Sequence, residues 1–138
     1  MELSISLLVL LYLLSGAVEF GLAFFQFVQL RDAAQEGALY GSMNPTDSAP
    51  IELRVRSSSS SPINLADSSQ VTVAITAYDK TPPKNMKNLT DACEGDALKV
   101  EAFYDHHIFM PFIPQLIGRN TITLHAVVTD TILSPVCP

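Results

Sequence analysis

The chain has 138 residues and a formal net charge of −6, and 48% of its residues are hydrophobic against 16% charged. This length has room for about one domain, since domains usually span roughly 100 to 200 residues, and it rules out a multidomain enzyme. The acidic balance argues against a nucleic-acid binder, which needs basic side chains to neutralise phosphates.

The first element is an apolar segment that begins at Leu3. No lysine, arginine or aspartate occurs between Leu3 and Leu30, and every basic residue lies from Arg31 onward. The apolar run continues through Glu19 as far as Phe25. It supplies the ~20 residues that a helix needs to cross a bilayer core of ~30 Å. The pattern predicts one transmembrane helix that carries one polar domain.

A cleavable signal peptide is the alternative interpretation of this segment. Its apolar core would be Leu3–Leu14, and the small residues Ser15–Ala17 would form the cleavage site. Two features disfavour it: no basic residue precedes the apolar run, and apolar residues continue at helical spacing from Phe24 to Tyr40. We expect a helix of ~60 Å that ends near Gly41–Pro45, because Gly41 can cap it and the residue before proline disfavours helix.

Small residues recur along this helix, among them Ala17, Gly21, Gly37, Ala38 and Gly41. Glycine costs a helix interior ~1 kcal/mol relative to alanine, so repeated small residues predict a face where another helix or a sheet comes close. The pattern suggests helix-on-helix assembly. The alternative is that glycine is simply tolerated in membrane helices.

Two glutamates, Glu2 and Glu19, are the energetically costly residues of the apolar segment. A carboxylate at the bilayer centre costs at least ~2.5 kcal/mol, so it normally lies near an interface, is paired, or is functional. The two glutamates are separated by ~26 Å of helix, so they can lie near opposite faces of the membrane. That placement and a functional role are equally open for Glu19, whereas a functional role is favoured for Glu2.

Three motifs of the N-terminal segment occur together. They are Met1-Glu2-Leu3 before an aliphatic stretch, Gly16-Ala17-Val18-Glu19-Phe20-Gly21-Leu22-Ala23-Phe24-Phe25, and Ala33-Ala34-Gln35-Glu36-Gly37-Ala38-Leu39-Tyr40. In this combination the segment resembles the TadE-like family of minor pilins, with the family's distance between the two glutamates. The resemblance covers residues 1 to about 42, and the rest of the chain matches only in its β-rich character.

The resemblance implies a pilin-like fold and a minor pilin or pseudopilin of a tight-adherence (Flp-type) pilus or a related secretion machine. Other pilin or pseudopilin subunits and the membrane would be its partners. By position, Glu2 would be the glutamate that in pilins pairs with the N-terminal amine of a neighbouring subunit. This pairing would act as a register check, because an unpaired buried carboxylate is penalised. The assembly residues on the helix would be Glu2, Glu19, Phe20, Gly21, Gly37 and Ala38.

Family precursors carry a basic leader that ends in glycine four residues before this glutamate, where a prepilin peptidase cuts. Here Met1 stands directly before Glu2. Either the chain is unprocessed, or its start was assigned too late at a GTG codon, since the family often has valine at this position. A prepilin peptidase is a partner if an upstream leader exists, and translating the upstream DNA in frame would distinguish the two cases.

The remaining residues, 44–138, are predicted to form an extracytoplasmic antiparallel sheet. Alternating apolar residues predict four strands, at Ile51–Arg56, Val71–Tyr78, Leu98–Tyr104 and Ile122–Val128. So small a sheet has too little core to be stable alone, so we expect it to pack on the helix around Ala33–Tyr40. The chain is therefore predicted to be α+β, with a transmembrane and assembly helix over residues 1–43 and a β-rich domain over residues 44–138.

The predicted connections differ in composition. Ser57–Pro62 indicates a flexible hairpin connection, and Thr81–Asn85 indicates a loop. Ile108–Ile117 is strongly apolar, but Pro111 and Pro114 interrupt it, so it cannot be a spanning helix. It is either a packed internal connection, which is favoured, or an exposed patch that meets a partner or the membrane surface.

Cys93 and Cys137 are the only cysteines, and both lie outside the predicted strands. In an oxidising compartment a disulfide between them would stabilise the domain by ~3 to 4 kcal/mol; two free thiols are the alternative. Metal binding is not expected from this pair, which lacks CxxC spacing, nor from His106 and His107, because neighbours in a strand point to opposite faces.

No phosphate-binding glycine loop, HExxH or GxSxG motif occurs, so we predict no catalytic site, no metal and no cofactor. Two function hypotheses remain. The first is a filament subunit; the second is a membrane-tethered extracytoplasmic module that binds a ligand or partner outside any filament. The cysteine pair and the family resemblance favour a single-pass protein of the cell membrane with its C-terminal domain outside the cytoplasm.

Overall fold

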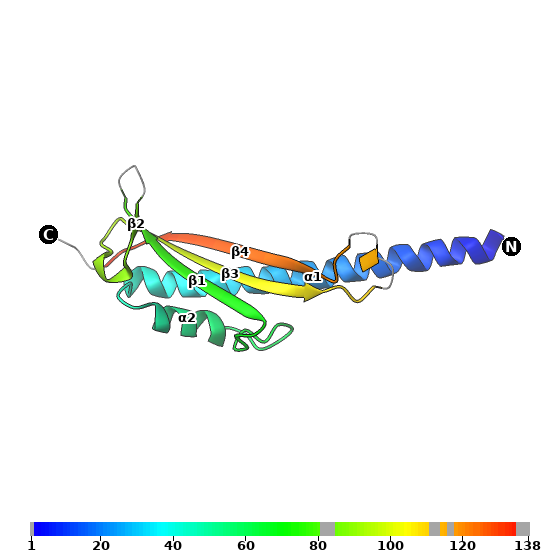
Figure 1. Cartoon of the computed structure of the whole chain (residues 1–138), viewed down its shortest axis with the longest axis horizontal. Coiled ribbons are helices and arrows are strands. Elements are labelled where there is room, and N and C mark those ends of the chain that lie inside the picture. Colours follow the sequence, from blue (N-terminus) through cyan, green and yellow to red (C-terminus); the bar gives the residue numbers. More distant parts are fainter. Residues whose placement is uncertain (1, 81–84, 111–113, 116–117, 135–138) are drawn as a thin grey trace.

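The computed structural model describes residues 2–80, 85–110, 114–115 and 118–134, in which a long helix lies along a small sheet and a short helix (Figure 1). The elements in chain order are α1 (Glu2–Met43), α2 (Ser48–Ser57), β1 (Val71–Tyr78), β2 (Met86–Lys87), the 3₁₀ turn η1 (Leu89–Asp91), β3 (Ala97–His107) and β4 (Thr121–Thr131). The predicted α+β fold, a long N-terminal helix followed by a small antiparallel sheet, is confirmed.

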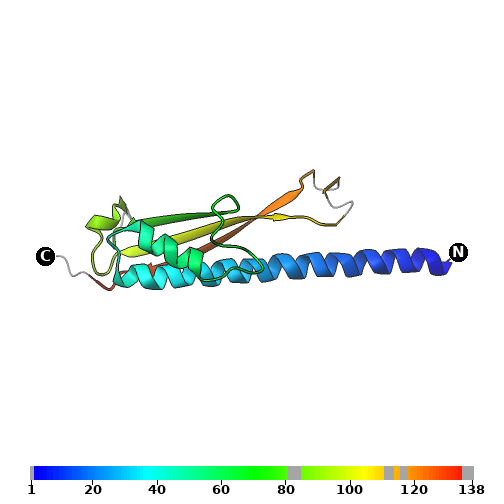
Figure 2. The ribbon, with the colours of Figure 1, turned by 90° about the horizontal axis from the view of Figure 1, so that it is seen from below.

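Helix α1 is continuous over 42 residues, which corresponds to ~63 Å. The part of α1 before Gly16, which contacts Met110, projects beyond the rest of the chain, and the C-terminal half of α1 is covered by the sheet and α2 (Figure 2). It ends where the sequence predicts, with the Asn44 N–H donating to the Tyr40 carbonyl at 3.1 Å. One helix therefore joins an uncovered apolar segment to the core of the domain.

The sheet has the order β2-β1-β3-β4, and all its pairs are antiparallel. Strand β3 is central and alternates as predicted: Leu98, Val100 and Ala102 are fully buried between more accessible neighbours. The inward face packs on α1, where Leu30, Ala33, Ala34 and Ala38 are at most 1% exposed. The expected packing of the sheet on the helix is therefore confirmed.

The strand predicted at Ile51–Arg56 is wrong, because this segment belongs to α2. Ile51 and Val55, one helical turn apart, are both fully buried, whereas Leu53 is 67% exposed. A short segment with apolar residues at i, i+2 and i+4 fits a strand and also presents i and i+4 on one side of a helix. Packing against α1 selects the helix.

The N-terminus of α2 also carries a signal that the strand prediction missed. Asp47 caps it by accepting a hydrogen bond from the Ala49 N–H at 3.1 Å, as acidic residues commonly do before a first turn. Within the helix, Arg56 Nε bonds Glu52 Oε1 at 2.7 Å with i,i+4 spacing.

The fourth strand of the sheet is instead β2, which pairs with the end of β1 through Ala77↔Lys87 and Tyr78↔Met86. The segment Ser57–Pro62 therefore leads from a helix towards β1, and it is not the hairpin connection that we predicted. Of the predicted loop Thr81–Asn85, residues 81–84 lie outside the described residues.

Close contact between α1 and its neighbours requires glycine at two positions. A Cβ on Gly37 would overlap Val55 of α2, and a Cβ on Gly41 would overlap Leu98 of β3 and lie 2.9 Å from Ile51 Cδ1. The small-residue face near the end of α1 is thus the surface on which α2 and the sheet of the same chain pack.

Candidate functional site

The uncovered half of α1 is an extensive apolar surface. Between Leu3 and Phe25 the large apolar side chains are 45–81% exposed. The helix has a mean hydropathy of 2.1 over its most apolar window, none of which is buried, and it is long and apolar enough to cross a membrane. Because so large an apolar surface is unfavourable in water, it belongs in a bilayer or against other apolar helices.

A polar cluster lies where the end of β3 meets this apolar half. His106 is 1% exposed, and its Nε2 lies 2.8 Å from Glu19 Oε1 while its Nδ1 lies 2.6 Å from Gln26 Oε1. Glu19 Oε1 also accepts a hydrogen bond from the Phe109 N–H at 3.2 Å. The two strongly polar side chains of the apolar segment between residues 3 and 28 thus bind one imidazole ring contributed by the sheet.

The periodicity of helix α1 and the alternation of strand β3 together bring these side chains close to one another. Glu19 and Gln26 are seven residues apart, so they lie on the same side of α1. His106 has the same parity as the buried residues of β3 and therefore points toward α1, whereas His107 is exposed on the other face. The cluster, named here the Glu19–His106–Gln26 cluster, ties the free end of the sheet to the helix.

Two proton arrangements satisfy both contacts of the His106 ring. An imidazolium donates to both oxygens; a neutral ring donates to Glu19 from Nε2 and accepts at Nδ1 once the Gln26 amide is turned over. In either arrangement both ring nitrogens are paired, as a buried ring in apolar surroundings requires.

Four of the six predicted assembly residues fall into two groups, and Glu19 belongs to the Glu19–His106–Gln26 cluster. Phe20 is 72% exposed, and a Cβ on Gly21 would meet no atom within 4 Å, so both positions are open to a neighbouring molecule. Gly37 and Ala38 are instead buried by α2 and the sheet of the same chain. Glu2 begins α1, and its assembly role stays a prediction.

Sequence reasoning considered His106 only as a metal ligand and did not find its partners. The signal was present in the seven-residue spacing of Glu19 and Gln26 and in the inward parity of His106. Neither the helix spacing nor the strand alternation indicates that β3 packs against this part of α1, so the contacts of His106 with Glu19 and Gln26 could not be deduced. Across the described parts of the chain, no group of three or more His, Cys, Asp or Glu residues is placed to hold a metal ion.

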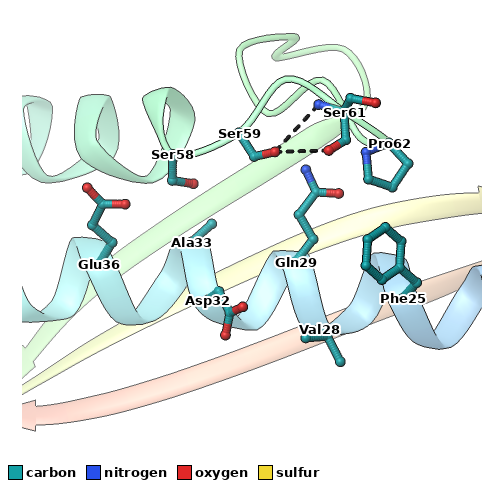
Figure 3. Close-up of a pocket in the computed structure, with 10 residues that line it drawn as sticks. All are labelled: Phe25, Val28, Gln29, Asp32, Ala33, Glu36, Ser58, Ser59, Ser61 and Pro62. Carbon is teal, nitrogen blue, oxygen red and sulfur yellow. Dashed lines mark hydrogen bonds between the residues drawn. The ribbon is translucent and has the colours of Figure 1, made fainter.

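The serine-rich connection after α2 makes a second contact with α1. An open cavity of about 300 Å³ lies between the two (Figure 3). The Gln29 amide pairs with the backbone of Ile63 in both directions, with Nε2 donating to the carbonyl at 3.0 Å and Oε1 accepting from the N–H at 3.1 Å. Phe25 points toward Pro62 beside it (Figure 3). The connection is therefore fixed on α1 where the helix becomes covered.

The opposite end of the sheet is held by a buried carboxylate. Asp96 is 1% exposed and accepts hydrogen bonds from Lys87 Nζ at 2.9 Å, the Cys93 N–H at 2.9 Å and the Lys80 N–H at 3.0 Å. Burial alone would raise the pKa of Asp96, but these hydrogen bonds and the Lys87 charge hold it below its usual value. Cys93 is disulfide-bonded; Cys137 lies outside the described residues, and the predicted pairing stays a prediction.

These features define a class: an α+β protein whose single long helix is apolar enough to span a membrane in one half and carries a small sheet on the other. Residues 1–39 match the model of the family described as TadE-like protein, which confirms the resemblance found in the N-terminal motifs. Searches of curated proteins and of solved structures gave no match.

Proposed function

We propose that this chain is a pilin-like minor subunit of a tight-adherence (Flp-type) pilus or a related secretion apparatus, which assembles through its N-terminal helix. The observation that carries the proposal is the uncovered apolar half of α1, which lies within the segment that matches the TadE-like family. Such a surface serves as an anchor in a bilayer, and it can exchange lipid for other apolar helices when subunits assemble.

The positions open on this half fit helix-to-helix contact. Phe20 and Phe24 stack with ring centroids 6.3 Å apart on the exposed surface of the helix. Gly21, the residue after Phe20, has no atom within 4 Å of an added Cβ and leaves space for close approach. Glu2 would pair with the N-terminal amine of the adjacent subunit. The other half of α1 is fixed in the domain, so the domain would be carried as the helix docks.

The proposal assigns the chain a structural role and no catalytic one. The C-terminal domain would lie outside the cytoplasm, as the disulfide at Cys93 favours. The partners would be other pilin or pseudopilin subunits and the membrane, with a prepilin peptidase acting on any upstream leader.

The test is the amount of the chain recovered in sheared filaments. Glu2→Ala should lower incorporation while leaving membrane insertion, measured by resistance to carbonate extraction, unchanged. Asp32→Ala, at an exposed acidic residue on the covered half of α1, is the matched control and should change neither. Equal incorporation of Glu2→Ala would contradict the pairing role. A wild-type chain that stays monomeric in the membrane, with no crosslinks to pilins, would favour the tethered binding module instead.

A further inference from the structure

The domain contacts α1 within its apolar run. Met110 is 5% exposed, and its Cε lies 3.9 Å from where a Cβ on Gly16 would be. The apolar run of α1 continues for nine residues beyond Gly16, as far as Phe25. At 1.5 Å per residue these residues correspond to ~14 Å, nearly half of the hydrocarbon thickness of a bilayer.

With Phe25, the last residue of the apolar run, at the outer boundary of the hydrocarbon, the contact between Gly16 and Met110 lies ~14 Å below that boundary. The hydrogen bond between Glu19 and the Phe109 N–H, six residues before Phe25, lies ~9 Å below it. A helix tilt of ~20° shortens these depths by less than about a tenth.

We propose that the turn after β3, Ile108–Met110, inserts into the outer leaflet beside α1 and is a second lipid contact of this chain. The inference rests on the membrane-spanning role of α1 in the proposed function. The chemistry of the turn fits lipid: Phe109 is 74% exposed although it is large and apolar. The sequence from Ile108 to Ile117 contains one strongly polar side chain, Gln115.

Several polar groups near the turn are paired within the chain, as a bilayer demands. His106 bonds both Glu19 and Gln26, and the Phe109 N–H donates to Glu19. The Ile108 N–H donates to the Asn120 carbonyl at 3.0 Å. The cluster thus has the arrangement by which a glutamate inside a membrane helix is stabilised, and it holds the turn against that helix.

A charged residue near the turn is compatible with this depth. Arg119 is exposed and precedes Asn120, whose carbonyl receives the Ile108 N–H. A guanidinium on a long aliphatic side chain can extend to the headgroup phosphates while its stem stays in the apolar region.

The test uses the full-length chain in phosphatidylcholine vesicles with and without brominated acyl chains. The chain contains no tryptophan, so a single introduced tryptophan reports its own surroundings. The probe is Phe109→Trp. The reference inside the bilayer is Leu11→Trp, on the uncovered half of α1. The reference outside is Met86→Trp, 68% exposed on β2 at the other end of the sheet (Figure 1).

Phe109→Trp should emit at a shorter wavelength than Met86→Trp, and brominated lipid should quench it to an extent closer to Leu11→Trp. Quenching no greater than that of Met86→Trp would overturn the inference. A short emission wavelength without quenching, lost when the vesicles are diluted in lipid, would show that a second copy covers the turn and would also overturn it.

The outcomes separate this inference from the proposed function. The vesicles hold no other pilus component, so an unquenched Phe109→Trp beside a quenched Leu11→Trp rejects the lipid contact and leaves the filament assay unaffected. An unquenched Leu11→Trp would remove the membrane-spanning premise shared by both.

Discussion

The glycine at position 37 allows a sharp test of how α2 packs on α1. In an ordinary helix interior, Gly37→Ala would stabilise the fold by ~1 kcal/mol, because alanine has the better helix propensity. Here the added Cβ would overlap Val55 Cγ2. Val55 is fully buried in a helix, and a valine there has one strongly preferred rotamer, so the methyl group cannot simply turn aside.

The overlap must be relieved by moving α2 or by forcing Val55 off its rotamer. Overpacking of this kind costs ~1 to 3 kcal/mol. The overlap is deep, so we take ~2 to 3 kcal/mol, and subtracting the propensity gain leaves a net destabilisation of ~1 to 2 kcal/mol. At ~4 °C per kcal/mol for a chain of this size, Gly37→Ala should lower Tm by about 4 to 8 °C.

Thermal unfolding of the full-length chain in detergent micelles, followed by near-ultraviolet circular dichroism, measures this shift. Gly21→Ala is the matched control, because nothing lies within 4 Å of its added Cβ, and it should not lower Tm. In the double variant Gly37→Ala/Val55→Ala the overlap is removed, so the two losses should be less than additive by ~2 to 3 kcal/mol. A Gly37→Ala variant as stable as the wild type, or strictly additive losses, would refute the packing argument.

Three further predictions concern the polar contacts. His106→Ala leaves Glu19 without its buried partner, so it should cost ~1 to 3 kcal/mol and speed proteolysis after β3. The hydrogen-bonded Asp96 carboxylate stabilises the fold above the usual pKa of an aspartate, and this stability is lost as the pH falls through the lowered pKa. The free energy of unfolding of the wild type should therefore decrease below about pH 4, which is called the acid transition here. Asp96→Asn, less stable at neutral pH, should show a flatter pH dependence. Gln29→Ala should speed hydrogen exchange at the Ile63 amide.

Each of these variants has a control at an exposed position. His107→Ala, on the opposite face of β3, should leave proteolysis unchanged. Asp32→Asn should keep the acid transition of the wild type, and Gln35→Ala should leave exchange at Ile63 unchanged. If His107→Ala and His106→Ala accelerate proteolysis equally, the cluster does not hold the turn. An unaltered acid transition in Asp96→Asn would show that another group governs it, and unaltered exchange in Gln29→Ala would show that its amide does not fix the connection.

The parts of the fold that were predictable have long or unambiguous periods. The apolar run of α1 and the alternation in β1, β3 and β4 each extend over enough residues to exclude the other period. Ile51–Arg56 failed because six residues fit both periods, and the contact with Gly37 that decides between them is made by a residue distant in sequence. Strand β2 has two residues, too few for any pattern.

Of the candidate site, only the residues contributed by the helix α1 were predictable. Glu19 stands out because a carboxylate in an apolar run is costly. Its partner could not be deduced, because the hydrogen bond joins residues 87 positions apart and depends on the register of β3 against α1. Small residues likewise predict that another element comes close, but they do not identify that element. The space beside Gly21 is open, whereas the space beside Gly37 is occupied by α2 of the same chain.

The position of the Glu19–His106–Gln26 cluster shows that the domain contacts part of the apolar run of α1, which the hydropathy pattern alone does not show. Apolar residues run as far as Phe25, but the sheet contacts the helix at Glu19 through His106, and the turn after β3 contacts it at Gly16 through Met110. A segment of the helix is therefore both apolar enough for the bilayer and occupied by the domain. If the helix spans a membrane as far as Phe25, the domain would rest at the bilayer surface with its turn inside the outer leaflet, as we propose above. A neighbouring subunit would then have the remaining sides of the same helix, including Phe20 and Gly21, available for contact.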